Sequence, residues 1–155
     1  MMDPAALWQY FKFFSPEQTM GFALERETQR PEDWSKTNPT HQFRSMGLNT
    51  GVMLWNLTRS RQLEERKRLV EMLQEEPSES NGYFKLGDQE VLNMLANEHP
   101  QRVYTLPCKF NIRLNAFCAE RPAPREPSIV HGSMGIFHAP FAKRCIYNRN
   151  ITGMW

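Results

Sequence analysis

The chain has 155 residues, the length of about one domain with a single modest core. Its 19 basic and 17 acidic residues are interspersed and give a net charge of +2, so charge alone indicates neither a nucleic-acid nor a membrane partner. Hydrophobic residues make up 40% of the chain, which excludes wholesale disorder, and no apolar run approaches the ~20 residues of a membrane-spanning helix.

The N-terminal segment predicts an amphipathic helix rather than a signal peptide. Leu7, Phe11 and Phe14 have the spacing of one helical face, and the segment has neither a basic region nor a small-residue cleavage site. The apolar run 19–24 then predicts a buried strand. Residues 25–46 are polar and contain prolines, so they predict a long loop.

Helices and strands alternate along the rest of the chain. The pattern predicts a strand at 51–57, a helix at 58–76, a turn at 77–82, a helix from Asp88, a strand at 102–107, an irregular segment at 111–128 and a short strand at 128–132. The apolar side of each helix consists of Leu63, Val70 and Leu73 in the first and Val91, Leu92 and Leu95 in the second. Glu64 and Arg68 have the spacing of a helix-stabilising ion pair. Strands separated by helices are typical of a layered α/β domain.

The three cysteines do not have the paired CxxC spacing of a zinc site. Cys108, Cys118 and Cys145 fit two interpretations, either three buried thiols or one disulfide with one free thiol. A short loop separates Cys108 from Cys118.

Three short motifs contain residues suited to ligand binding or catalysis, and the first is Asn49-Thr50-Gly51. Gly51 allows close approach of the backbone to a ligand, and the Asn49 amide can both donate hydrogen bonds to hydroxyl groups and accept them. Taken by itself, the triplet is more typical of an ordinary turn before a strand.

The second motif is Gly87-Asp88-Gln89, at the start of a predicted helix. Asp is a preferred N-cap residue and Gly often precedes it, so helix capping explains this motif by itself. The alternative is that the carboxylate and the neighbouring amide bind a polar ligand.

The third motif is His131-Gly132, which follows the apolar pair Ile129-Val130 at the end of a predicted strand. A single histidine in such a place is more often a core residue than a ligand. His41 and His99 lie in polar surroundings and are expected to be exposed.

The order of LNTGVMLWNL, GDQEVLN and IVHG resembles the C-terminal half of a retaining family 8 glycosyltransferase, within it the animal glucoside and xyloside xylosyltransferases. The first two segments fit the family patterns F-N-[ST]-G-V-M-L-x-N and G-D-Q-[DE]-x-[LF]-N, except that Leu48 replaces Phe. The resemblance implies the C-terminal portion of a GT-A fold, the nucleotide-diphospho-sugar transferase fold, with a mixed sheet flanked by helices.

The resemblance also implies roles for the motif residues. Asn49, Thr50, Gly51 and Asp88 would contact the donor sugar, and Asp88 would hold its hydroxyls. Gln89 would project its carbonyl toward the anomeric carbon, where an oriented dipole stabilises an oxocarbenium-like centre. His131 would be a ligand of a divalent cation, usually manganese.

Two further features follow from the same resemblance. The xylosyltransferases carry two cysteines around the loop between Cys108 and Cys118, which suggests a disulfide and an oxidising lumen. Asn111 and Arg113 match a W-N-x-R-like stretch, with Phe110 in place of Trp. They would contact donor or acceptor, or serve only in loop packing.

The resemblance predicts UDP-xylose-dependent α-xylosyl transfer to O-linked glucose or xylose on a glycoprotein, in the endoplasmic reticulum or Golgi lumen. Residues 1–155 would be a partial catalytic domain without the N-terminal nucleotide-binding half, its Asp-x-Asp metal motif and a type II signal anchor. A truncated product of this kind would be inactive alone. The alternative is an inactive remnant that binds a sugar or a protein. The three motifs occur in glucose, galactose and xylose transferases, so the choice of xylose depends on NTGVMLWNLTRSR and the cysteine loop.

Overall fold

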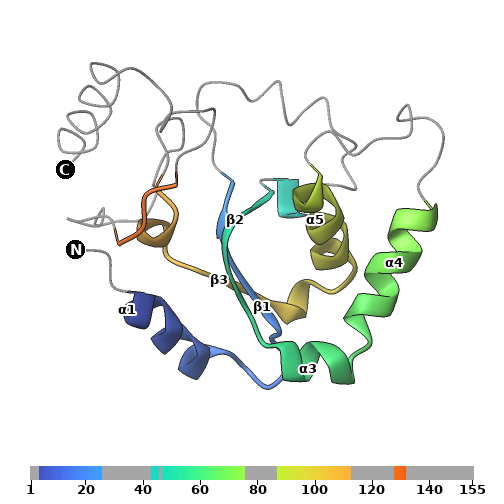
Figure 1. Ribbon diagram of the computed structural model, residues 1–155, viewed down its shortest axis with the longest axis horizontal. Coiled ribbons are helices and arrows are strands. Elements are labelled where there is room, and N and C mark those ends of the chain that lie inside the picture. Colours follow the sequence, from blue (N-terminus) through green and yellow to red (C-terminus); the bar gives the residue numbers. More distant parts are fainter. Residues whose placement is uncertain (1–3, 26–42, 46, 76–86, 113–127, 132–155) are drawn as a thin grey trace, which may run out of the picture.

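The computed structural model describes residues 4–25, 43–45, 47–75, 87–112 and 128–131. Its centre is a three-stranded mixed sheet in the order β2-β1-β3 (Figure 1). The strands are β1 (Met20–Leu24), β2 (Leu48–Trp55) and β3 (Val103–Thr105). β1 pairs antiparallel with β2 and parallel with β3. The mixed sheet expected from the resemblance is therefore confirmed.

Helices cover both faces of this sheet (Figure 1). The helical elements are α1 (Pro4–Trp8), η1 (Gln9–Phe13), η3 (Phe43–Ser45), α3 (Leu57–Gln62), α4 (Glu65–Glu75), α5 (Asp88–Glu98), η5 (Pro100–Arg102) and η6 (Cys108–Phe110). The predicted N-terminal helix is thus one turn of α-helix continued by a 3-10 helix. Helix α5 begins at the predicted residue.

Two hydrophobic clusters lie on opposite faces of the sheet. The larger one packs α5 and α4 against β1 and contains Met20, Phe22, Phe43, Leu48, Met72, Val91, Leu92, Leu95, Ala96 and Val103. The smaller one joins Phe14, Leu54 and Leu106 with the aromatic side chains of η1. Gly21 in β1 makes room for it, because a Cβ atom there would lie 2.9 Å from Cζ of Phe14.

The helix predicted at 58–76 is interrupted, which corrects the sequence-based boundaries. Glu64 has a φ of 53°, and this left-handed residue separates α3 from α4. Because the break changes the direction of the chain, the expected apolar side is exposed, with Leu63, Val70 and Leu73 at 41%, 45% and 55% of their full accessibility. Met72 is buried in their place.

Arg68 pairs with other carboxylates than the predicted Glu64. Its guanidinium Nε donates to Oε2 of Glu98 at 2.9 Å, and it also pairs with Glu71 and Glu75. The contact with Glu98 connects α4 to the end of α5.

Two irregularities in strand pairing occur near the motifs. In the β1–β2 ladder, Phe22 pairs with Met53 and the next residue, Ala23, pairs with Asn49, so residues 50–52 bulge out of the strand. The predicted strand at 128–132 is a single parallel bridge between Ile112 and Val130. Residues 77–82, predicted as a turn, lie outside the described residues.

Cys108 is disulfide-bonded, so the interpretation with three free thiols is wrong. Cys118 and Cys145 lie outside the described residues, and Cys118 as the partner stays a prediction. Among the described residues, no helix is long and apolar enough to cross a membrane.

Candidate functional site

Residues from all three motifs meet at one end of the strands, where β1 ends, β2 begins and α5 starts (Figure 1). A network of side-chain hydrogen bonds joins them, and we call it the amide network. It comprises Glu25, Asn49, Gln89, Asn111 and His131. These residues are distant in sequence, so only the fold brings them together.

Asn49 lies at the centre of the amide network and is buried, with 4% of its surface exposed. Its Nδ2 donates to Oε2 of Glu25 at 2.6 Å and to Oε1 of Gln89 at 3.1 Å. Its Oδ1 accepts from the backbone N–H of Gly51 at 3.0 Å and from Nδ2 of Asn111 at 2.6 Å. An asparagine amide has two donor hydrogens and two acceptor lone pairs, so protein groups occupy all four positions.

Gln89 connects the start of α5 to the bulge of β2. Its Oε1 accepts from Nδ2 of Asn49 and, at 3.2 Å, from the backbone N–H of Thr50. Its Nε2 donates to Oε2 of Glu25 at 3.2 Å. The carbonyl that the resemblance directs toward a donor sugar therefore faces β2 in this structure, and the amide is held at both ends.

Glu25 is a member of the amide network that the sequence analysis missed. It follows the last residue of β1, is 4% exposed, and accepts hydrogen bonds from two side-chain amides. Its backbone N–H donates to the carbonyl of Gly47 at 2.9 Å, which holds it beside the start of β2. The one available signal was an acidic residue directly after a buried apolar strand.

Asn93, the last residue of the GDQEVLN motif, was also missed, and it fixes the framework of the site. It is fully buried on α5. Its Oδ1 accepts from the backbone N–H groups of Leu48 and Phe43 at 2.7 and 3.2 Å. Its Nδ2 donates to the carbonyls of Leu48 and Gln89 at 3.0 and 2.6 Å. The side chain thus sets the distance between α5 and the beginning of β2.

His131 enters the amide network through Asn111. The two backbones are adjacent, since the N–H of His131 donates to the carbonyl of Ile112 at 2.8 Å. Nδ1 of the imidazole lies 3.0 Å from Oδ1 of Asn111, which is buried. The ring also packs directly on Gly51, where a Cβ atom would overlap ring atoms Cε1 and Nδ1 and lie 2.7 Å from Nε2.

Asp88 is exposed and does not cap α5, which excludes the capping interpretation of the motif. Asp88 is the first helical residue, and the N-cap is Gly87, with φ 62° and ψ −127°. A left-handed φ favours glycine at that position. The carboxylate of Asp88 lies in the first turn of α5, where the helix dipole stabilises negative charge.

Of the ligands expected for a manganese site, the described residues include one candidate, His131. Within the described ranges, no group of three or more His, Cys, Asp or Glu side chains is arranged to hold a metal ion. His131 fits the role of a single ligand, because its Nδ1 is hydrogen-bonded to an amide oxygen, as is usual for metal-binding imidazoles. The other ligands would have to come from elsewhere.

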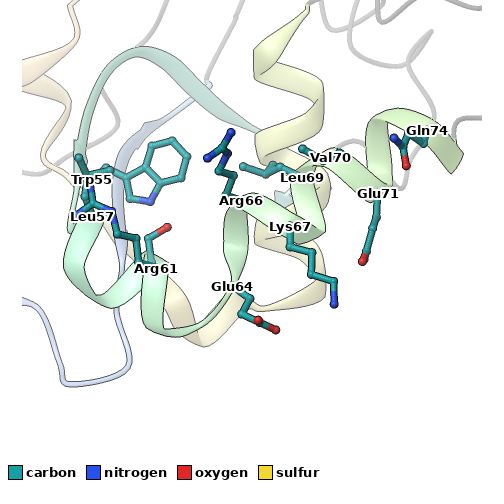
Figure 2. A pocket seen from close by; sticks show the side chains of 11 residues that line it. Trp55, Leu57, Arg61, Glu64, Arg66, Lys67, Leu69, Val70, Glu71 and Gln74 are labelled. Atoms are coloured by element: carbon teal, nitrogen blue, oxygen red, sulfur yellow. The ribbon is translucent and has the colours of Figure 1, made fainter.

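A concave surface lies away from the amide network, along α3 and α4 (Figure 2). It has a volume of about 830 Å³, and none of the amide-network residues lines it. Trp55 and Leu57 form one side of this groove, and Leu69 and Val70 on α4 form the other. Arg66 extends between the two sides in Figure 2.

Comparison with known proteins connects these motifs to a family. The model of the family described as glycosyl transferase family 8 matches residues 9–133. Glucoside xylosyltransferase 1 of Danio rerio is 30% identical over 144 residues, which cover 86% of this chain and 36% of that protein. Xyloside xylosyltransferase 1 of Homo sapiens is 30% identical over 150 residues, covering 90% and 35%.

The fold also has a counterpart among solved structures. The crystal structure of mouse xyloside xylosyltransferase 1 in its apo form matches with a TM-score of 0.56 and 23% sequence identity. The match covers 86% of this chain and 53% of that one, and it shows a shared fold. The chain spans about a third of the length of the two curated relatives described above.

Proposed function

This chain belongs to glycosyltransferase family 8, and we propose on that premise that it contributes to a retaining transfer of xylose from UDP-xylose to O-linked glucose or xylose on a glycoprotein. The observation that carries the proposal is the amide network, because it brings together residues of all three motifs beside the bulge of β2. The names of the xylosyltransferase relatives support xylose as the sugar and a glucoside or xyloside as the acceptor.

Within this proposal, the bulge at residues 50–52 and the exposed Asp88 contact the donor sugar. Asn49 serves as the support of this surface, since its four hydrogen-bonding positions are occupied within the protein. Asp88 contacts the sugar hydroxyls, and its negative charge balances positive charge that develops at the anomeric carbon. Gln89 supports the same surface from below, because two donors on β2 hold its carbonyl in a fixed direction.

His131 provides one ligand to a divalent cation in the same proposal. A manganese ion, when bound, neutralises the charge that accumulates on the departing diphosphate. The 155 residues contain no Asp-x-Asp, so we propose that they form the C-terminal part of a catalytic domain whose remaining ligands belong to a nucleotide-binding half. Such an enzyme would act in the lumen of the endoplasmic reticulum or Golgi, consistent with the disulfide at Cys108.

The test joins this chain to the N-terminal half of human xyloside xylosyltransferase 1, with that half alone as the control. We expect the joined protein to transfer xylose from UDP-xylose to a glucosylated or xylosylated peptide with an α-linkage, and the half alone to be inactive. The 155-residue chain alone should show no transfer. Formation of a β-linked product, or transfer of glucose but not xylose, would overturn the proposal.

A second candidate is a module that binds a sugar or a protein without transfer. Two observations favour it. These 155 residues contain no Asp-x-Asp, and the described residues contain no group of three side chains arranged to hold a metal ion. Saturable binding of UDP-xylose by the isolated chain, together with an inactive joined protein, would support this candidate over the transferase.

A further inference from the structure

The orientations of the Asn49 and Asn111 side-chain amides can be derived from one backbone group. The N–H of Gly51 can only donate a hydrogen bond, and it lies 3.0 Å from one atom of the Asn49 amide. That atom must therefore be the acceptor Oδ1. The carboxylate of Glu25, 2.6 Å from the other end of the same amide, independently requires the donor Nδ2 there.

The same reasoning extends to Asn111. Its amide approaches Oδ1 of Asn49 to 2.6 Å, and an acceptor requires a donor opposite it, so this end of Asn111 is Nδ2. Its other end, Oδ1, then faces the imidazole of His131 at 3.0 Å. Since Oδ1 can only accept, Nδ1 of His131 must carry the hydrogen.

We propose that Asn111 is a positioning residue that holds neutral His131 in the tautomer with hydrogen on Nδ1, so that Nε2 carries the lone pair offered to a divalent cation. The tautomer follows from the hydrogen-bond order alone, whereas the role of Nε2 as ligand rests on the proposed function. Neutral histidine in water favours hydrogen on Nε2, so the protein selects the less common form.

Two further contacts make this selection effective. The bond from the His131 backbone to Ile112 places the imidazole next to Asn111. The backbone of Gly51 packs against the ring and leaves no space for a side chain. The imidazole is therefore held on one side by an amide oxygen and on another by β2, as expected of a ligand with a fixed direction.

The test is the long-range ¹H–¹⁵N spectrum of the histidine rings in the 155-residue chain, recorded at a mildly alkaline pH. We expect Nδ1 of His131 to show the shift of a protonated nitrogen and Nε2 that of an unprotonated one. Asn111→Ala should move His131 toward the form with hydrogen on Nε2. Asn111→Gln keeps both an acceptor oxygen and the donor that Oδ1 of Asn49 requires, and it should retain more of the original pattern than Asn111→Ala.

His99 is an internal control, because its ring pattern should stay the same in all three proteins. A wild-type His131 with hydrogen on Nε2 would overturn the inference without any variant, as would an unchanged pattern in a folded Asn111→Ala protein.

Addition of Mn²⁺ alone separates this inference from the proposed function. We expect Mn²⁺, added to the joined protein that supplies the remaining ligands, to broaden the His131 signals at lower concentration than those of His99. Asn111→Ala should weaken this effect by about tenfold or more, the usual loss when a ligand loses its supporting hydrogen bond. Broadening that Asn111→Ala leaves unchanged would overturn the positioning role at the metal. The expected tautomer without selective broadening would support Asn111 and overturn the ligand role of His131.

Discussion

Gly51 shows how one atom can decide the geometry of a site. The residue has no side chain, and the imidazole of His131 occupies the volume that a Cβ atom would fill. The functional expectation for this glycine was close approach of the backbone to a ligand. The structure gives it a second role, as the surface against which a candidate metal ligand is held.

Gly51→Ala should therefore destabilise the chain by about 1–3 kcal/mol, the usual cost of inserting an atom into a packed site. The cause is the overlap with His131, so the cost should fall when that ring is removed. A double-mutant cycle of Gly51→Ala with His131→Ala, measured by urea unfolding, should show this coupling. Additive effects of the two substitutions would indicate that Gly51 is needed for another reason.

Asp88→Asn separates the charge of this residue from its place in the helix. Because Gly87 and not Asp88 is the N-cap, the substitution should cost only about 0.3–1 kcal/mol of stability, through the helix dipole. If the carboxylate contacts the donor sugar, turnover of the joined protein should fall by about a hundredfold, near the effect of removing one preorganised electrostatic contact. The assay is turnover with UDP-xylose alongside a melting curve, and unchanged turnover would contradict the catalytic role.

At the scale of elements, a few polar side chains set the positions of whole helices. Asn93 joins α5 to β2, and Arg68 joins α4 to α5. Neither contact follows from hydrophobic periodicity, because periodicity identifies the buried face of a helix but not the polar groups within that face. The GDQEVLN motif therefore has one residue, Asn93, whose role is to hold the others in place.

Asn93→Ala should be among the most destabilising substitutions in the chain. It leaves the backbone groups of Leu48 and Phe43 without their amide partner in a buried place, at a cost of about 1–3 kcal/mol for each unsatisfied group. Asn97→Ala is the matched control, since Asn97 is exposed one turn later on α5, and it should change stability by less than about 0.5 kcal/mol. Equal effects in urea unfolding would refute the role of Asn93.

The contact between α4 and α5 predicts a dependence on pH. The hydrogen bond from Arg68 holds the pKa of Glu98 below its ordinary value of 4.5. A carboxyl group with a lowered folded-state pKa stabilises the fold above pH 4.5, and this contribution is lost as the pH falls through the lower folded value. Glu98→Gln should therefore flatten the stability curve below pH 4.5. A curve as steep as that of the wild type would assign the acid sensitivity to other groups.

At the scale of the whole molecule, the sequence predicted the elements better than their orientation. The strand at 19–24, helix α5 and the strand at 102–107 all occur, because their apolar patterns are regular. The break at Glu64 was not predictable from periodicity, since it depends on a single left-handed residue. Leu73 therefore lies outside, although its spacing was typical of a buried face.

The candidate site was predictable only in part, for a similar reason. The motifs identified Asn49, Gln89 and His131, but their connections run through buried amides far apart in sequence. Glu25 was missed because it begins the polar segment that the sequence predicts as a loop, where an acidic residue is ordinary. Which groups are hydrogen-bonded depends on the packing of β1, β2 and α5.

The last prediction concerns the stability of the isolated chain. Much apolar surface is exposed on α3 and α4, including Leu57, Leu63, Val70 and Leu73. Within the described sheet, β2 and β3 are edge strands that can pair with other chains. The combination favours a marginally stable protein that self-associates, because uncovered apolar patches and open edges promote association. We expect calorimetry to give a melting temperature below about 65 °C, the upper end for mesophilic domains. Gel filtration should show concentration-dependent elution. A monomer that melts cooperatively well above that temperature would show that these 155 residues form a self-sufficient domain.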